Sequence, residues 1–281
     1  MTTSLNTLLD HLRSHSKTER EKGTYFEELS KVFLENDPVQ ISQYEEVTTY
    51  SNWAEKYGFN KGDTGIDLVA KLRDEDGYCA IQCKFYSEDH AILKGDIDSF
   101  FTASGKIHFT RRLIIDSTRA PWSKHAEDAL DNQNPPVTRI GLSDLAESPI
   151  DWNIYFKDQK VVLSDKKSLR PHQTEALQAV RNGFEKADRG KLIMACGTGK
   201  TFTGLKIAED LAGAGKSVLF LVPSLSLMSQ TVKEWTIDAG IPLRSFAVCS
   251  DTQVGRRRRS DDFGDLDIHD LASVVAGNAR S

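Results

Sequence analysis

The sequence predicts an α/β protein built in two successive parts, and three observations lead to this prediction. Amphipathic helical segments within residues 4–36 precede several short strand candidates and a hairpin turn. After residue 168 the pattern becomes helix, strand, loop, helix and strand, which is typical of a parallel sheet with crossover helices. A polar interval over residues 149–168 separates the two patterns, so we expect domains over residues 1–160 and 161–281.

Composition and charge exclude several classes of protein. The formal net charge of −5 argues against a broadly basic nucleic-acid coat, although a local basic cleft is compatible with it. No apolar run approaches the ~18 residues of a membrane span, and the first residues do not resemble a secretory signal. The four cysteines form no CxxC pair. We therefore expect a cytoplasmic protein with no membrane partner.

The first part begins with helices and continues with strands. Residues 1–20 form a helical N-terminal segment, and a polar interval over residues 14–22 separates it from a second helix. The acidic turn at residues 74–77 predicts a hairpin between two of the strands. The expected strands cover residues 43–49, 66–72, 78–85 and 112–116, followed by a helix over 122–130; the resemblance described below implies a last strand and helix over 139–145.

The second part alternates helices with buried strands. Its expected elements are a helix over residues 169–186, a strand over 191–195, a helix over 201–212 and a strand over 217–222. Between the first strand and the next helix lies a Gly-Thr-Gly turn, whose amides and helix terminus favour a phosphate group. Lys200 would reach the terminal phosphates, and the Thr201 hydroxyl would bind Mg²⁺. The chain is therefore expected to bind a nucleotide through Gly197, Thr198, Gly199, Lys200 and Thr201.

A second group of polar residues lies on the hairpin of the first part. Strand periodicity puts Gln82 and Lys84 on one face, and Asp67 falls near the start of the partner strand. Charges on an otherwise apolar strand carry a large desolvation penalty and therefore indicate either pairing or a site. The alternative interpretation is a structural ion pair between Asp67 and Lys84, with Glu27 on a solvated helix face.

Residues 194–201 resemble motif I of superfamily 2 helicases and translocases, a group with RecA-like lobes. The segment at 169–176 resembles the element of that superfamily whose glutamine binds adenine, which implies that role for Gln173. Residues 218–224 resemble motif Ia, which makes Ser224 a candidate contact to a nucleic-acid phosphate. The acidic cluster at 261–270 matches the superfamily's Asp-Glu pair poorly. We therefore expect a partial RecA-like parallel α/β lobe that binds ATP without being a competent ATPase.

The hairpin group resembles the PD-(D/E)xK nucleases, specifically the Mrr-like branch in which glutamine replaces the second acid. This resemblance implies a restriction-endonuclease-like mixed sheet flanked by helices. It also implies that Asp67 and Gln82 bind Mg²⁺, that Lys84 orients the attacking water, and that Glu27 assists.

A nuclease followed by a superfamily 2 motor resembles the N-terminal part of an ATP-dependent restriction enzyme of the Type ISP class. That resemblance implies an endonuclease acting on double-stranded DNA, with a methyltransferase and target recognition either in the same polypeptide or in separate subunits. Two alternatives stay open. One is a repair or defence helicase whose nuclease-like domain only binds DNA, and the other is a subunit of a Type I-like system.

Overall fold

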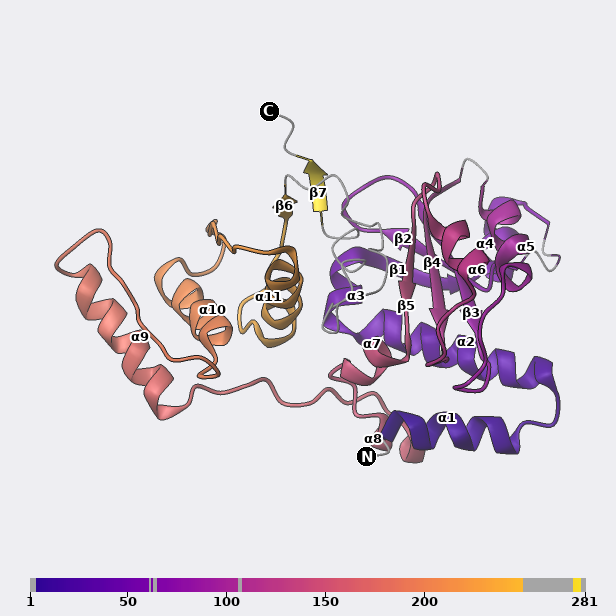
Figure 1. The fold of residues 1–281 in the computed structure, drawn as a ribbon, viewed down its shortest axis with the longest axis horizontal. Coiled ribbons are helices and arrows are strands. Elements are labelled where there is room, and N and C mark those ends of the chain that lie inside the picture. The colour runs from indigo at the N-terminus through magenta and orange to yellow at the C-terminus, as the bar shows by residue number, and fades with distance from the viewer. Residues whose placement is uncertain (1–3, 61, 63–64, 106–107, 250–274, 279–281) are drawn as a thin grey trace. The chain divides into compact units, whose positions relative to one another are not determined.

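The computed structural model describes residues 4–60, 62, 65–105, 108–249 and 275–278. The chain divides into two compact units, Met1–Ser164 and Asp165–Ser281 (Figure 1). Three sequence features lie outside the described residues. They are positions 63–64, which lie between two glycines just before Asp67, a run of four arginines at 256–259, and the acidic cluster at 261–270.

The first unit contains eight helices and five strands among its described residues. The helices are α1 (Ser4–His15), α2 (Glu19–Asn36), α3 (Pro38–Gln43), α4 (Tyr50–Tyr57), α5 (Lys94–Ser104), α6 (Lys124–Leu130), α7 (Leu142–Glu147) and α8 (Trp152–Asp158). The strands are β1 (Tyr44–Thr49), β2 (Leu68–Leu72), β3 (Tyr78–Lys84), β4 (Phe109–Asp116) and β5 (Val137–Ile140).

The five strands form one mixed sheet in the order β1-β2-β3-β4-β5. The strand β2 pairs antiparallel with β1 and β3, whereas β4 lies parallel between β3 and β5. Because β3, β4 and β5 are parallel, their carboxyl ends meet at one edge of the sheet. The expected mixed sheet flanked by helices is confirmed.

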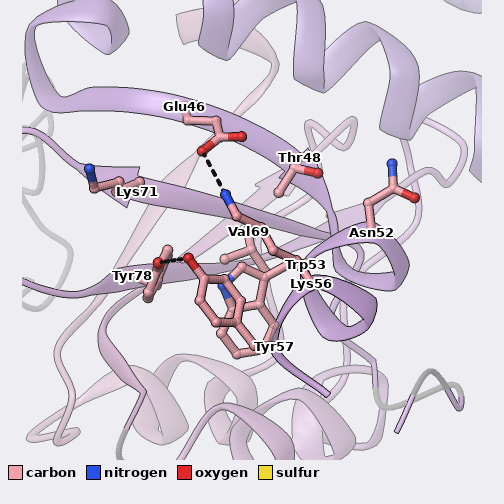
Figure 2. Close-up of a pocket in the computed structure, with 9 residues that line it drawn as sticks. All are labelled: Glu46, Thr48, Asn52, Trp53, Lys56, Tyr57, Val69, Lys71 and Tyr78. Atoms are coloured by element: carbon pink, nitrogen blue, oxygen red, sulfur yellow. Dashed lines mark hydrogen bonds and ion pairs between the residues drawn. The ribbon is translucent and has the colours of Figure 1, made fainter. Parts of the chain in front are cut away.

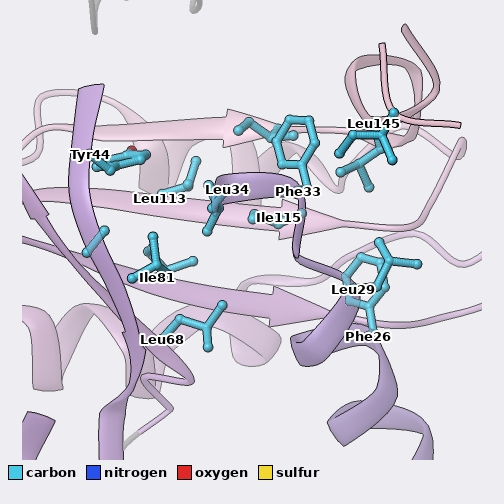
Figure 3. Close-up of a cluster of buried hydrophobic side chains, with 14 of the residues drawn as sticks. Phe26, Leu29, Phe33, Leu34, Tyr44, Leu68, Ile81, Leu113, Ile115 and Leu145 are labelled. Carbon is cyan, nitrogen blue, oxygen red and sulfur yellow. The ribbon is translucent and has the colours of Figure 1, made fainter. Parts of the chain in front are cut away.

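Helices cover both faces of the sheet and create two hydrophobic cores. Residues of α1, α2, α7 and α8 pack on one face, where Phe26 and Trp152 are among the largest buried side chains. Figure 3 shows the side chains of α2 lying over the strands of this core. The other face is covered by α4, α5 and α6, which contribute Trp53, Phe100 and Ala126. This three-layer arrangement buries the middle strands on both sides.

The sequence patterns located most elements of the first unit and missed four helices. The expected break between the first two helices is confirmed, because the Thr18 hydroxyl accepts a hydrogen bond from the Glu21 amide and begins α2. The helices α3, α4, α5 and α8 were not predicted. Three of them have only 6, 8 and 7 residues, too short for a helical period to repeat clearly, and α5 buries only Ile97, Phe100 and Ser104 in eleven positions.

The second unit contains α9 (Pro171–Phe184), α10 (Lys200–Leu211), α11 (Leu225–Asp238), β6 (Ala247–Cys249) and β7 (Val275–Asn278). Phe202, Leu205 and Trp235 form its small core. The predicted strands over 191–195 and 217–222 are wrong for the described part of the chain, where neither segment pairs with another strand. Ile193 and Leu219 are 90% and 84% exposed. Apolar composition indicates a tendency to be buried, but a strand also requires a hydrogen-bonded neighbour.

No helix among the described residues is both long enough and apolar enough to cross a membrane.

Candidate functional site

The pairing of β2 with β3 brings two predicted site residues together. Leu68 pairs with Ile81 in the antiparallel register, so Asp67, one residue before β2, lies beside Gln82. The Asp67 amide donates to the Ile81 carbonyl at 2.9 Å, and the Asp67 carboxylate accepts from the Cys83 amide at 2.7 Å. The half-buried Asp67 carboxylate is therefore held against the backbone at the carboxyl end of β3.

Gln82 is buried, with 2% of its surface exposed, and its two amide atoms have different surroundings. The side-chain nitrogen donates to the Gly65 carbonyl at 2.9 Å. The side-chain oxygen is buried with no hydrogen-bond partner. A buried acceptor without a partner is costly, so this oxygen, in the residue opposite Asp67, is a candidate ligand for a bound group.

Gly65 is needed at this point of the chain for conformational and steric reasons. Its φ is +77°, and an added Cβ would lie 2.7 Å from the Ser99 hydroxyl and 3.4 Å from the Gln82 side-chain nitrogen. Glycine tolerates this conformation without strain. The turn therefore allows the Gly65 carbonyl to hold the Gln82 amide in one orientation.

Lys84 is the last residue of β3 and pairs in register with Asp116 of β4. The predicted alternation of side chains along β3 is confirmed, because Cys79 and Ile81 lie in the core on one face of the sheet and Ala80 lies in the core on the other face. That alternation puts Lys84 on the face that carries Gln82. Lys84 and Asp67 are therefore both attached to the backbone at the same edge of the sheet.

Glu27 comes from α2, on the other side of the same sheet edge, and is half-buried. Burial raises the pKa of the Cys83 thiol well above its usual value; Asp67 and Glu27 raise that pKa further, whereas Lys84 lowers it. Three of the predicted catalytic groups thus act electrostatically on one sulfur atom. Asp67, Gln82 and Lys84 thus lie at the end of β3, and Glu27 belongs to α2, which packs on the opposite face of the sheet.

The oxygen donors at this edge fit a magnesium ion. Among the described residues, no three His, Cys, Asp or Glu side chains are grouped so as to hold a metal. Mg²⁺ usually keeps several waters and takes one or two carboxylates together with substrate phosphates. The Asp67 carboxylate and the orphaned Gln82 oxygen supply this smaller set of ligands.

A buried ion pair that the sequence did not reveal lies next to Lys84. Asp116 is fully buried and accepts from Arg139 at 2.6 Å and from the Thr118 hydroxyl at 2.6 Å. The Arg139 guanidinium also lies 4.5 Å from the centre of the Trp122 ring. These bonds fix the carboxyl ends of β4 and β5 beside β3. The sequence did not reveal this pair, because Asp116 and Arg139 lie on different strands and the sequence does not give the register between them.

The phosphate loop of the second unit has the backbone expected of an anion site. Gly197 and Gly199 have φ values of +75° and +80°, and α10 begins at the next residue, Lys200. The Lys200 ammonium donates to the Met194 carbonyl at 3.3 Å, and the Thr198 hydroxyl donates to the Ala195 carbonyl at 2.8 Å. Both interactions close the loop on itself. Thr201 is half-buried in the first turn of α10.

Gln173 contacts this loop through its side-chain nitrogen and the start of α9 through its side-chain oxygen. It is buried, with 4% exposed, and its nitrogen donates to the Thr198 carbonyl at 3.0 Å. Its oxygen accepts from the Arg170 amide at 2.9 Å at the start of α9. The amide therefore ties α9 to the phosphate loop, and adenine recognition by Gln173 stays a prediction. Ser224 accepts from the Leu227 amide and begins α11.

A pocket of about 200 Å³ lies toward the other end of β2 and β3 in the first unit (Figure 2). Trp53, Tyr57 and Tyr78 form its aromatic side, and the Tyr57 and Tyr78 hydroxyls are 2.6 Å apart. An ion pair of 3.7 Å between Glu46 and Lys56 crosses it. None of the four predicted catalytic residues lines this pocket.

Both units match known protein families. Residues 35–162 match the family described as restriction endonuclease, and residues 166–260 match the family described as Type III restriction enzyme, res subunit. A comparison with curated proteins found no match.

Solved structures give similar relatives. The ATP-dependent Type ISP restriction-modification enzyme LlaBIII bound to DNA is 35% identical, with a TM-score of 0.74, over 88% of this chain and 16% of that chain. A nuclease-deletion mutant of the Type ISP restriction-modification enzyme LlaGI, in complex with a DNA substrate mimic, is 44% identical over 33% of this chain and 9% of that chain, with a TM-score of 0.29.

The chain thus spans only 16% of the length of LlaBIII, although the match includes most of its own residues. The sheet with its flanking helices and the position of the phosphate loop agree with the two family matches. The chain joins a domain of the restriction endonuclease family to a helicase-like domain of the Type III res-subunit family, and it is similar over most of its length to a Type ISP restriction enzyme.

Proposed function

We propose that the first unit is a Mg²⁺-dependent DNA endonuclease whose centre consists of Asp67, Gln82 and Lys84, assisted by Glu27. The observation that carries this proposal is the buried Gln82 oxygen, which has no partner and belongs to the residue that lies opposite Asp67 in the register of β2 and β3. A structural ion pair between Asp67 and Lys84 would not explain why an amide oxygen is buried without a partner.

Each residue has a task that follows from its chemistry and place. Asp67 and Gln82 would hold the metal ion, which supplies a more acidic water and a polarised phosphoryl oxygen. Lys84 would orient the attacking water and offset negative charge that develops on the phosphate. Glu27 approaches from α2 and would assist directly or through water.

We further propose that the intact protein moves on double-stranded DNA by ATP hydrolysis before it cuts. Residues 197–201 would hold the phosphates and Thr201 the magnesium ion of ATP, with Gln173 at the adenine. The remainder of the same polypeptide, or separate methyltransferase and specificity subunits, would complete the system. The similarity to LlaBIII supports this wider role.

One observation favours a second candidate function, a nuclease-like domain that binds DNA without cutting it. In the part of the chain that the structure describes, no three acidic, histidine or cysteine side chains are grouped at a metal-binding distance. A domain with only one carboxylate and one amide in position would bind Mg²⁺ weakly until DNA phosphates complete the shell. The two functions differ in their metal binding and in their products.

The test compares the full chain with its Asp67→Asn and Gln82→Ala variants on supercoiled plasmid. We expect nicking in Mg²⁺, no nicking in EDTA, and at least a hundredfold loss in both variants. Glu46→Gln, on the edge strand β1, is the matched control and should cut normally. Calorimetric titration with Mn²⁺ in the presence of DNA should show binding that both variants lose. An unmodified chain that binds plasmid but neither binds Mn²⁺ nor cuts would establish the second candidate instead.

A further inference from the structure

Arg13, near the end of α1, donates to backbone carbonyls that lie far away in sequence. Its Nε and one terminal nitrogen donate to the Tyr86 carbonyl at 3.2 and 3.0 Å. The same terminal nitrogen donates to the Ser117 carbonyl at 3.4 Å. Tyr86 follows β3 by two residues and Ser117 follows β4 by one. One guanidinium thus bridges the chain segments that leave two neighbouring parallel strands.

Ser117 extends this bridge to the backbone of Lys84. The Ser117 amide donates to the Lys84 carbonyl at 3.0 Å. The Ser117 hydroxyl accepts from the Tyr86 amide at 3.1 Å and donates to the Tyr86 carbonyl at 2.9 Å. Since Ser117 is fully buried, these bonds are protected from water. The backbone on which Lys84 sits is therefore connected to Arg13 through two hydrogen-bonded residues.

The residue between Lys84 and Tyr86 is held from two sides. The Phe85 ring stacks on the Phe26 ring of α2 with 5.0 Å between centroids. The Arg13 guanidinium lies 5.1 Å from the centre of the same Phe85 ring. Phe26 precedes Glu27, so the same contacts link both sides of the proposed centre. The packing leaves Phe85 little freedom to shift.

We propose that Arg13 is a positioning residue, which fixes the end of β3 so that the Lys84 ammonium faces the Asp67 and Gln82 oxygens. This inference rests on the proposed endonuclease function. A displacement of about 1 Å can lower a rate by about a hundredfold.

Direct contact with DNA explains Arg13 less well. Its side chain is only 19% exposed, and its other terminal nitrogen donates to the Asp10 carboxylate at 2.9 Å. An arginine that binds phosphates needs an open fork of donors. The donors of Arg13 are instead directed to two carbonyls and a carboxylate of its own unit.

The test uses the full chain and compares Arg13→Gln with Arg73→Gln. Arg73 is a matched control, because it also donates to two backbone carbonyls, those of Ile41 and Tyr44, but at the hairpin end of the sheet. We expect Arg13→Gln to lower the single-turnover rate of plasmid nicking by about ten- to a hundredfold, with DNA affinity within about twofold of the parent. Arg73→Gln should leave the rate within about twofold.

Two further measurements separate positioning from general destabilisation. Hydrogen exchange at Tyr86 and Ser117 should be faster in Arg13→Gln and unchanged in Arg73→Gln. In a Lys84→Ala background, Arg13→Gln should cause no further loss of the residual rate, because the group that Arg13 positions is gone. Arg13→Lys retains the charge but not the planar fork of donors that spans the Tyr86 and Ser117 carbonyls, so it should recover only part of the rate.

Each possible result has a definite meaning. No cleavage by the unmodified chain would overturn the endonuclease itself. An active parent with an equally active Arg13→Gln variant, or an equal loss in Arg73→Gln, would overturn only the role of Arg13. Additive losses in the double variant would show that Arg13 supports the fold and not Lys84.

Discussion

The carboxyl end of β3 and the phosphate loop before α10 are both built from strand-like segments followed by turns, but they are supported differently. At β3, neighbouring strands pair in register and helices cover both faces, so Gln82 is 2% exposed. At the phosphate loop, the preceding segment pairs with no described strand, and Ile193 is 90% exposed. The first geometry depends on tertiary neighbours, and the second depends on two glycines and a helix terminus.

This difference indicates which substitutions will matter in each region. A site held by neighbouring strands is sensitive to charge changes on those strands, because burial strengthens electrostatic interactions. A loop held by its own backbone is sensitive to any residue that disfavours a positive φ.

The largest effect is expected at Lys84. We expect Lys84→Ala to lower the rate of plasmid nicking by on the order of a hundredfold to a thousandfold, because a preorganised cation near the reacting phosphate is lost. The measurement is a single-turnover nicking assay with saturating Mg²⁺. Lys71→Ala is the matched control, since Lys71 lies on β2 and forms an exposed ion pair of 2.6 Å with Glu45. Equal rates for the two variants would remove Lys84 from the centre.

A smaller effect is expected when Gln82 becomes glutamate. The Gln82 nitrogen donates to the Gly65 carbonyl, so a carboxylate there would lose a donor and face a carbonyl oxygen. We expect Gln82→Glu to be about 2 kcal/mol less stable than the parent in EDTA, since buried polar atoms are left unpaired. Added Mg²⁺ should restore much of this loss, which urea unfolding in both conditions will show. The same loss with and without Mg²⁺ would mean that no ion binds beside residue 82.

The sequence predicted candidate residues for both regions, but it did not predict the contacts that support them. Strand alternation predicted that Gln82 and Lys84 share one face of β3 and that Asp67 lies beside them at the start of the partner strand. The register of β2 and β3 places Asp67 across from Gln82. Arg13, Asp116 and Arg139 could not be found, because their partners are up to 104 positions away in the chain. The apolar runs at 191–195 and 217–222 predicted strands, yet composition carries no information about whether a pairing neighbour is present.

Nucleotide binding by the phosphate loop should weaken when Gly199 is replaced by alanine. Gly199 has a φ of +80°, and an added Cβ would lie 2.5 Å from the Gln173 side-chain nitrogen. Gly213 has a similar φ of +72° with nothing within 4 Å, so Gly213→Ala reproduces the backbone strain without the clash. We expect Gly199→Ala to bind a fluorescent ATP analogue about tenfold more weakly than Gly213→Ala does, since the loop and Gln173 must move apart. Equal affinities would show that Gln173 does not shape the loop.

The smallest expected effect is the response of the first unit to alkaline pH. Burial raises the pKa of the Cys79 thiol to about 12 from 9.0, although the nearby Tyr44 hydroxyl and Arg111 lower it. The unfolded chain therefore loses this proton first, so the stability from the neutral thiol is complete below pH 9 and is lost between pH 9 and 12.

Between pH 8 and 9.5 this loss should amount to about 0.8 kcal/mol of unfolding free energy, at 1.36 kcal/mol per pKa unit. Urea unfolding followed by tryptophan fluorescence will measure it, because Trp53, Trp122 and Trp152 are all buried in the first unit. Cys79→Ala should remove only the part of this pH dependence that comes from Cys79, because burial also raises the pKa of the Cys83 thiol and that group responds over the same range. Cys196→Ala, at an exposed cysteine of the phosphate loop, should leave it unchanged. If both variants keep the parent's pH dependence, the alkaline response has its origin in other groups, and the contrast between a buried and an exposed region does not extend to these thiols.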